Sequence, residues 1–296
     1  MSRKAVIVIG SNSTRCISAD PLDPGIPAIR RRVETRLFLH LRDGCLADED
    51  IAATVSGIRG LMDQAGADML GIYATSAVRD ARTAAQLSQA IEEICGIPLT
   101  VLSGEEEAAA SFYGAAGDKP AGMIDIGGGS TEIAIGCGMR IQGAVSLQLG
   151  ASRLFARQPI NSVQDVAPAM TAASDACKHS PALLAAHDGI NLFYSVGGTG
   201  TACACLLQGL SRKQARIEGC TLHRNDIYDR LMAIAALPRE QRALIPGFPP
   251  SRTDILPTGM AILAAVMDRL GLETVTVTER TNGDGLLRAS AMQKCP

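Results

Sequence analysis

The sequence is poor in aromatic residues and has no tryptophan: Phe, Trp and Tyr together make up 3% of its 296 residues. Proteins that bind single-stranded nucleic acid stack bases on aromatic side chains, so this class of partner is disfavoured. A positive net charge is also lacking, because 28 Lys and Arg residues stand against 30 Asp and Glu residues. With a formal net charge of −2, the protein has no overall positive field, and any anion site must be local.

A cysteine framework and a membrane segment are lacking as well. The nine cysteines form no CxxC pair, which argues against a disulfide framework and a zinc site and is typical of reduced cytosolic thiols. The apolar run at residues 4–9 is too short for a signal sequence, and no later run is long enough to span a bilayer. We therefore expect a cytoplasmic protein with no membrane contact.

The chain does contain an alternation of strands and helices. Residues 4–9 (KAVIVI) and 69–74 (MLGIYA) predict buried strands. From Asp48, predicted as an N-cap, apolar residues recur at helical spacing, and a second helix is expected between Ala84 and Gly96. Later expectations are a strand at 190–196, helices at 225–237 and 257–270, an irregular connection at 238–256 and a last strand at 273–278. This alternation indicates an α/β protein.

The opening of the chain is repeated in its second half. Residues 121–136 (AGMIDIGGGSTEIAIG) align without a gap with the VIVIGSNSTRCISA segment, so that GGGST at 127–131 falls on GSNST at 10–14. Such a repeat at the distance of a domain indicates a duplication. We expect two lobes, residues 1–118 and 119–296, with the last helix able to pack back on the first lobe.

The two repeated turns are candidate phosphate cradles. Small Gly and Ser residues let backbone N–H groups approach phosphate oxygens, and their hydroxyls add donors. A tight hairpin is the simpler reading for one such turn, but a repeat favours a common function. The expected ligands are Ser11, Asn12 and Ser13 of the first cradle (residues 10–14) and Gly127, Gly128, Gly129, Ser130 and Thr131 of the second cradle (residues 127–131). Residues 197–201 are expected as a third turn, with Gly198 and Thr199 as ligands.

Several charged residues have both a chemical and a structural reading. Asp125 ends a strand before the second cradle, where a carboxylate reaches a metal ion or caps the turn. Glu105–Glu107 offer a base for water or an acidic first turn that opposes a helix dipole. Arg79 grips phosphate or pairs with a neighbouring carboxylate such as Asp80. The Arg30–Arg32 run is interpreted as a solvated edge without a site role.

The motifs together resemble one known family. These are GSNSTR (10–15), ATSAVRDA (74–81), SGEEEAAASFYG (103–114), DIGGGSTE (125–132), VGGTGTA (196–202) and IPGFPPSRTDIL (245–256). In this order they resemble the exopolyphosphatase and guanosine pentaphosphatase family. The resemblance implies an α/β, duplicated actin-like (ribonuclease H-like) fold with two lobes and a cleft between them. It also implies a hydrolase that removes a terminal phosphate from polyphosphate or guanosine pentaphosphate.

The same resemblance implies roles for individual residues. Matching the EEA segment makes Glu107 the carboxylate that activates water, with Glu106 as the alternative, and gives Arg79 a phosphate contact. Glu132 resembles the glutamate that helps Asp125 hold Mg²⁺. The implied partners are polyphosphate or guanosine penta- and tetraphosphate, and a homodimer is common among relatives.

The sequence departs from the family pattern at a few positions. Val8 stands where the first repeat has an aspartate in the family, and valine cannot bind a metal ion. Thr83 replaces an asparagine, and Gly283 and Asp284 replace an Arg-Glu pair. Two alternative hypotheses therefore stay open: a non-catalytic binder or sensor of these anions, and an ATP-dependent kinase of the same fold, because fold does not fix chemistry.

Overall fold

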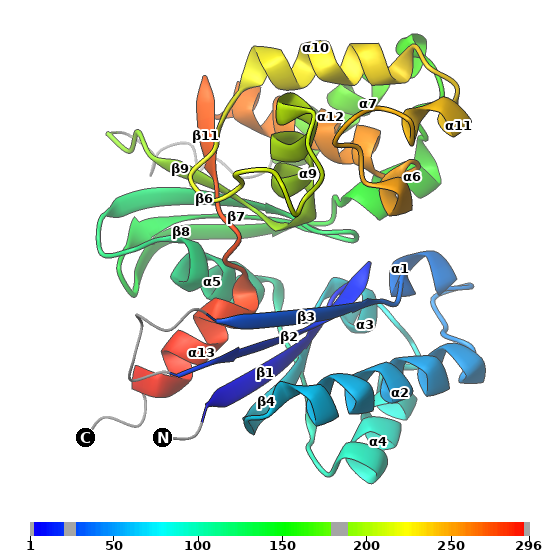
Figure 1. Cartoon of the computed structure of the whole chain (residues 1–296), viewed down its shortest axis with the longest axis vertical. Coiled ribbons are helices and arrows are strands. Elements are labelled where there is room, and N and C mark those ends of the chain that lie inside the picture. The colour runs from blue at the N-terminus through cyan, green and yellow to red at the C-terminus, as the bar shows by residue number, and fades with distance from the viewer. Residues whose placement is uncertain (1–2, 21–27, 179–188, 293–296) are drawn as a thin grey trace. The chain divides into compact units, whose positions relative to one another are not determined.

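The computed structural model describes residues 3–20, 28–178 and 189–292, and the chain forms two compact units. Unit 1 comprises Met1–Gly114 and Asn282–Pro296, and unit 2 comprises Ala115–Thr281. The expected division after residue 118 lies close to Gly114, after which the chain passes from unit 1 to unit 2. The last helix belongs to unit 1, and Figure 1 shows it in red beside the blue N-terminal strands.

Unit 1 is built on a five-stranded sheet with the order β3-β2-β1-β4-β5. β2 is antiparallel to β1 and β3, whereas β4 runs parallel to β1 and β5 parallel to β4. The near-continuous apolar sequence of β1 fits this central position, because both faces of the strand are covered. The strands are β1 (Lys4–Ile9), β2 (Ser13–Ala19), β3 (Ile29–Glu34), β4 (Asp68–Ala74) and β5 (Leu99–Val101).

Helices cover both faces of this sheet. Ile7 and Ile9 share a core with α2 and α4 on one face, whereas Val6 and Ile17 pack against Leu287 of α13 on the other. The helices of unit 1 are α1 (Leu37–His40), α2 (Asp48–Ala65), α3 (Ser76–Arg79), α4 (Ala84–Cys95), α5 (Gly104–Ala115) and α13 (Asn282–Met292). The N-cap of α2 is Ala47, so the prediction for Asp48 was wrong by one residue. Its carboxylate still stabilises the helix from the first turn.

Unit 2 repeats the topology of unit 1. Its six-stranded sheet has the order β10-β11-β9-β6-β7-β8, and β8-β7-β6-β9-β11 reproduces β3-β2-β1-β4-β5 with the same strand directions. The strands are β6 (Pro120–Ile126), β7 (Thr131–Cys137), β8 (Arg140–Leu147), β9 (Phe193–Val196), β10 (Thr221–His223) and β11 (Thr274–Val277). The shared topology confirms the duplicated actin-like fold.

The core of unit 2 is formed around α12, whose residues from Leu256 to Met267 are all buried. The other helices are α6 (Ala151–Arg157), α7 (Val166–Cys177), α9 (Gly197–Gln208), α10 (Arg224–Ala235) and α11 (Arg239–Arg242), with 3₁₀ turns η1 (Val163–Asp165) and η2 (Pro250–Arg252). Residues 197–201 are therefore the first turn of α9 and not a separate turn as predicted. The connection at 238–256 contains α11 and η2.

Candidate functional site

The first cradle uses its carbonyl groups internally and leaves amide groups available. Gly10 N donates to Ser13 O (3.1 Å), while Ser11 O and Asn12 O accept from the backbone amides of Phe38 and Arg36 (both 3.0 Å). Among the described residues, the amides of Ser11 and Asn12 donate no hydrogen bond. A turn with engaged acceptors and available donors is suited to an anion.

The side chains of the first cradle are also polar and buried. Ser11 Oγ lies 2.9 Å from Ser76 Oγ, and Ser13 Oγ accepts from Arg15 Nε (3.3 Å). The side-chain oxygen of Asn12 is buried and has no hydrogen-bond partner in the described part of the chain. Because the oxygen and nitrogen of an amide are interchangeable in such an assignment, Asn12 can present donors to an anion.

The second cradle has the same construction in unit 2. Gly127 N donates to Ser130 O (3.0 Å), and the carbonyls of Gly127 and Gly128 accept from the first amides of α6 at 2.8–2.9 Å. The amides of Gly128, Gly129 and Ser130 donate no hydrogen bond within the described ranges, and the buried Ser130 hydroxyl has no partner there. The Thr131 hydroxyl instead donates to Leu149 O (2.5 Å), so this predicted ligand has a structural contact.

The N-terminus of α9 brings a carboxylate and an arginine together. Gly197 has φ +86°, and a Cβ there would lie 2.6 Å from Asp125 Oδ1. A Cβ on Gly198 would collide with the guanidinium group of Arg252. Both glycines thus allow charged groups to approach the first amides of the helix, where a helix dipole favours anions. Thr199, predicted as a ligand, is buried.

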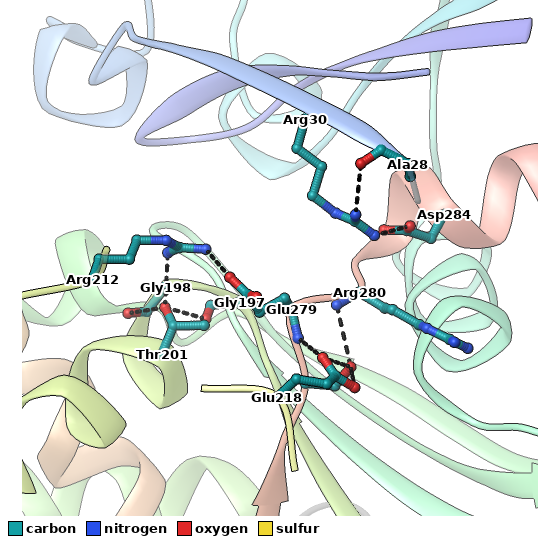
Figure 2. A network of polar contacts seen from close by, with 11 residues as sticks. Ala28, Arg30, Gly197, Gly198, Thr201, Arg212, Glu218, Glu279, Arg280 and Asp284 are labelled. Atoms are coloured by element: carbon teal, nitrogen blue, oxygen red, sulfur yellow. Dashed lines mark hydrogen bonds and ion pairs between the residues drawn. The ribbon is translucent and has the colours of Figure 1, made fainter. Parts of the chain in front are cut away.

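Arg252 is a candidate residue that the sequence analysis did not single out, although it lies in the IPGFPPSRTDIL motif. Another arginine, Arg212, reaches the same helix: its Nη1 donates to Thr201 Oγ1 (3.3 Å), and its Nη2 lies 3.0 Å from Glu279 Oε1 (Figure 2). The Thr201 hydroxyl donates in turn to Gly197 O (3.1 Å). The start of α9 therefore carries two cationic side chains.

Arg79 and Glu107 form an ion pair in unit 1 in which Glu107 is buried and Arg79 is half-buried. Arg79 Nη1 donates to Leu102 O (2.7 Å) and to Glu107 Oε2 (3.2 Å), and Glu107 is 6% exposed. The other terminal nitrogen of Arg79, Nη2, is buried without a partner among the described residues. Arg79 thus pairs with Glu107, and one donor group of its guanidinium remains available to an anion.

The neighbouring Glu106 has a different environment. Its carboxylate accepts from Ser103 N (2.8 Å), and Ser103 Oγ accepts from Glu106 N (3.2 Å), which is a reciprocal capping box at the start of α5. Glu106 is exposed. Of the two roles considered for Glu105–Glu107, stabilisation of the helix start therefore applies to Glu106. Glu107 instead forms an ion pair with Arg79.

A row of polar residues crosses the sheet of unit 2 beside the second cradle. Asp125 lies opposite Glu132, and Glu132 lies opposite Ser146, so all three side chains share one face. Ser146 Oγ donates to Glu132 Oε1 (2.7 Å), and Glu132 is 1% exposed. We call these three residues the acidic row. Two carboxylates, completed by water and phosphate oxygens, are a ligand set that suits Mg²⁺.

The corresponding row of unit 1 has no carboxylate. Val8 lies opposite Arg15, and Arg15 lies opposite Arg32; we call these residues the basic row. Val8 is 3% exposed, and a Cβ on Gly283 would lie 3.5 Å from Val8 Cγ2 and would collide with Ile17 Cδ1. This close apolar packing under α13 does not fit a metal ion. In the described ranges, no group of three or more His, Cys, Asp or Glu residues could hold one.

The described cysteines and histidines belong to no group of three or more that could hold a metal ion. Burial raises the pKa of the Cys203 thiol to about 12, so this group is a packing residue. His40 Nδ1 lies 2.8 Å from Asp50 Oδ1 at an exposed position. His179, His187 and Cys295 lie outside the described residues. No described helix is both long and apolar enough to cross a membrane.

Comparisons with known proteins agree with this architecture. SCO0757 of Streptomyces coelicolor, an uncharacterized protein, is 29% identical over 310 residues, covering 96% of this chain and 89% of its own length. An exopolyphosphatase-like protein of known structure shares 24% identity with a TM-score of 0.86, over 99% of this chain and 100% of that one. An exopolyphosphatase from Cytophaga hutchinsonii shares 20% identity with a TM-score of 0.84, over 98% of both chains.

The structure of the Aquifex aeolicus PPX-GPPA enzyme is similar too, with 21% identity, a TM-score of 0.80 and coverage of 97% of this chain and 99% of that one. The model of the Ppx/GppA phosphatase family matches residues 42–293. That match spans most of unit 1 and all of unit 2, including both Arg79 and Glu107 and the whole second cradle. The chain therefore belongs to the Ppx/GppA phosphatase family.

Proposed function

We propose that this protein is a phosphohydrolase that removes the terminal phosphate from inorganic polyphosphate or the 5′ terminal phosphate from guanosine pentaphosphate. The observation that carries the proposal is the ion pair of the buried Glu107 with the half-buried Arg79, in which Arg79 keeps an available donor. A carboxylate beside a phosphate-binding arginine is the arrangement that attack by water on phosphorus requires.

In this mechanism Glu107 accepts a proton from the attacking water. The water oxygen forms a bond to the terminal phosphorus, and the bond from that phosphorus to the bridging oxygen breaks. The bridging oxygen stays on the shortened chain, and orthophosphate is released. The ion pair with Arg79 holds the Glu107 carboxylate in position, and Arg79 Nη2 donates to a phosphate oxygen.

The amide groups of the two cradles are proposed to hold phosphate groups of the substrate. They are fixed before binding, because neighbouring amides already engage the carbonyls of both turns. Preorganised donors of this kind stabilise developing charge without reorganisation. Arg252, at the first turn of α9, is proposed as a further phosphate contact.

Mg²⁺ is proposed to bind at Asp125 and Glu132, where it would neutralise charge on phosphate oxygens. Ser146 orients Glu132 by its hydrogen bond. The similarity to solved structures that include an exopolyphosphatase supports a polyphosphate substrate. A cytoplasmic location and a homodimer stay predictions.

The second candidate function is binding of the same anions without hydrolysis, and Val8 favours it. Phosphate release from polyphosphate and from guanosine pentaphosphate, with and without Mg²⁺, distinguishes the two. Glu107→Gln should lower release by about 1,000-fold, a loss typical of a removed general base and its ion pair. Glu106→Gln, the same change on the capping residue, should keep activity within about threefold. Equal losses in both variants would refute the role of Glu107, and no release by the wild type would favour the binder.

A further inference from the structure

The carbonyl groups of the second cradle face the start of α6. Gly127 O accepts from the backbone amide of Ala151 (2.9 Å). Gly128 O accepts from the next two amides of the helix (2.8 and 2.9 Å). The third carbonyl, that of Gly129, accepts instead from a side chain, because Arg153 Nε donates to it (2.5 Å). The third peptide group of the turn is thus held by a guanidinium group.

These bonds also set the direction of the amide groups in the turn. The peptide bonds here are trans, and in a planar trans peptide the C=O and N–H groups point in opposite directions. Fixing three successive carbonyls toward α6 therefore directs the amides of Gly128, Gly129 and Ser130 away from that helix. These three amides are the ones that the described residues leave available, beside the buried Ser130 hydroxyl. The contact of Arg153 thus determines where the last of these donors, the Ser130 amide, points.

Two further features show that this contact is part of the construction of the turn. A Cβ on Gly150 would lie 2.4 Å from Gly128 O, so glycine at this position lets the start of α6 come close to the turn. In the first cradle the carbonyl at the aligned position, Asn12 O, accepts from the backbone amide of Arg36 (3.0 Å). The third carbonyl is therefore engaged in both repeats, by a backbone amide in unit 1 and by Arg153 in unit 2.

We propose that Arg153 is a positioning residue of the second cradle, which acts on a bound phosphate group through the peptide group between Gly129 and Ser130. Phosphate as the ligand of this cradle rests on the proposed function, whereas the contact rests on the geometry of the turn. Without the Nε–H donor this peptide group is free to rotate, since glycine permits many backbone conformations. The rotation turns the Gly129 carbonyl toward the anion in place of the Ser130 amide. Phosphate then binds more weakly, because a carbonyl oxygen repels it.

Substitutions of similar length at this position separate the hydrogen bond from the charge. Arg153→Gln has an N–H donor at the same number of bonds from Cα as Nε, but it has no charge. Arg153→Lys keeps the charge and has a methylene group in place of that donor. Arg153→Met has neither the donor nor the charge. Arg157→Met, on an exposed arginine of the same helix, is the matched control.

Calorimetric titration of inorganic tripolyphosphate without Mg²⁺ measures binding apart from turnover. We expect Arg153→Met and Arg153→Lys to weaken binding by about tenfold, the value of one hydrogen bond from a charged donor. Arg153→Gln should stay within about threefold of the wild type, because it keeps a donor, and Arg157→Met should stay within about twofold. The KM for polyphosphate should rise in the same order. Thermal unfolding of the same proteins shows whether affinity merely follows stability.

Several outcomes would overturn the positioning role. Weak binding by Arg153→Gln with normal binding by Arg153→Lys would mean that the charge acts directly on the anion. Equal weakening by Arg157→Met would mean a general electrostatic effect, and affinities that follow the unfolding midpoints would mean a structural role alone. If Arg153→Met does not fold, the comparison of the Gln and Lys variants decides.

The proposed hydrolysis can fail independently of this role. A wild type that binds tripolyphosphate in the expected order of variants but releases no phosphate refutes only the hydrolysis. Phosphate release with an unchanged KM in Arg153→Met refutes only the positioning role. A wild type that binds no tripolyphosphate would overturn both the role of Arg153 and phosphate binding by the cradle.

Discussion

The acidic row and the basic row occupy the same positions in the two halves of the duplicated fold, yet they carry opposite charge. In unit 2 the sequence of partners across the sheet is Asp125, Glu132 and Ser146; in unit 1 it is Val8, Arg15 and Arg32. The backbone turns beside the rows are alike, since each is closed by a hydrogen bond from its first glycine to its fourth residue. The duplication has therefore kept the geometry of the turn and changed the row.

The difference teaches that the same positions of a duplicated sheet can carry carboxylates in one half and guanidinium groups in the other. A pair of carboxylates supplies oxygen ligands for a cation, whereas a pair of guanidinium groups can bind phosphate directly, without a cation. Val8 packs against α13, because a Cβ on Gly283 would lie 3.5 Å from Val8 Cγ2. Val8 is therefore part of the apolar surface on which α13 packs.

Within the two rows, the largest expected effect on activity comes from removing one charge of the acidic row. Asp125→Asn should lower Mg²⁺-dependent phosphate release by about 100-fold, because one of two protein ligands loses its charge. Titration of Mg²⁺ by calorimetry should show the same loss without substrate. Asp268→Asn, on an exposed carboxylate of α12, is the matched control and should change neither value. A loss that is the same at every Mg²⁺ concentration would contradict a metal role for Asp125.

Restoring a carboxylate to the basic row should not restore a metal site. Val8→Asp places a charged group at a position that is 3% exposed, beside Ile17 and opposite Arg15. We expect a loss of about 2–3 kcal/mol in the free energy of unfolding, as for a buried polar group with incomplete pairing. Urea denaturation measures it, with Val8→Thr as the control of similar shape. Tighter Mg²⁺ binding in Val8→Asp at unchanged stability would contradict this prediction. It would mean that a carboxylate at position 8 can bind a metal ion without disturbing the packing of α13.

The contact of α13 with the basic row can be tested at Gly283. Gly283→Ala should cost about 1–2 kcal/mol of stability, because the added Cβ collides with the side chain of Ile17. Gly60→Ala in α2 is the opposite case, since a Cβ there meets nothing within 4 Å. That change should stabilise the protein by about 0.5–1 kcal/mol. If thermal unfolding showed the same sign for both variants, α13 would not be held by this contact.

The sequence allowed prediction of the duplication and of the strands that precede both cradles, because a repeat and β-branched runs are local signals. It did not show that residues 197–201 begin a helix, because glycine is uncommon at helical positions. Gly197 and Gly198 occur there because a larger residue would collide with Asp125 or Arg252. It also did not separate Glu106 from Glu107. The two are adjacent in sequence, and only the partners Ser103 and Arg79, one local and one distant, distinguish them.

The interpretation of Arg30–Arg32 illustrates a further limit of sequence reasoning. A run of three arginines was given no site role, because a solvated edge is its common explanation. The register between β2 and β3, which sequence does not provide, places Arg32 opposite Arg15 and Arg31 on the other face. Which of the three side chains shares a face with Arg15 depends on this pairing.

The smaller of the two expected effects on Mg²⁺ binding is at Ser146, which occupies in the acidic row the position of Arg32 in the basic row. Ser146→Ala removes the hydrogen bond to Glu132 Oε1 and should weaken Mg²⁺ binding by about tenfold, as for other groups that orient a metal ligand. Ser152→Ala is the matched control, because its buried hydroxyl has no partner among the described residues. Calorimetric Mg²⁺ titration of both variants measures the difference. Equal Mg²⁺ affinities of the two variants would mean that Glu132 does not need Ser146 to orient it.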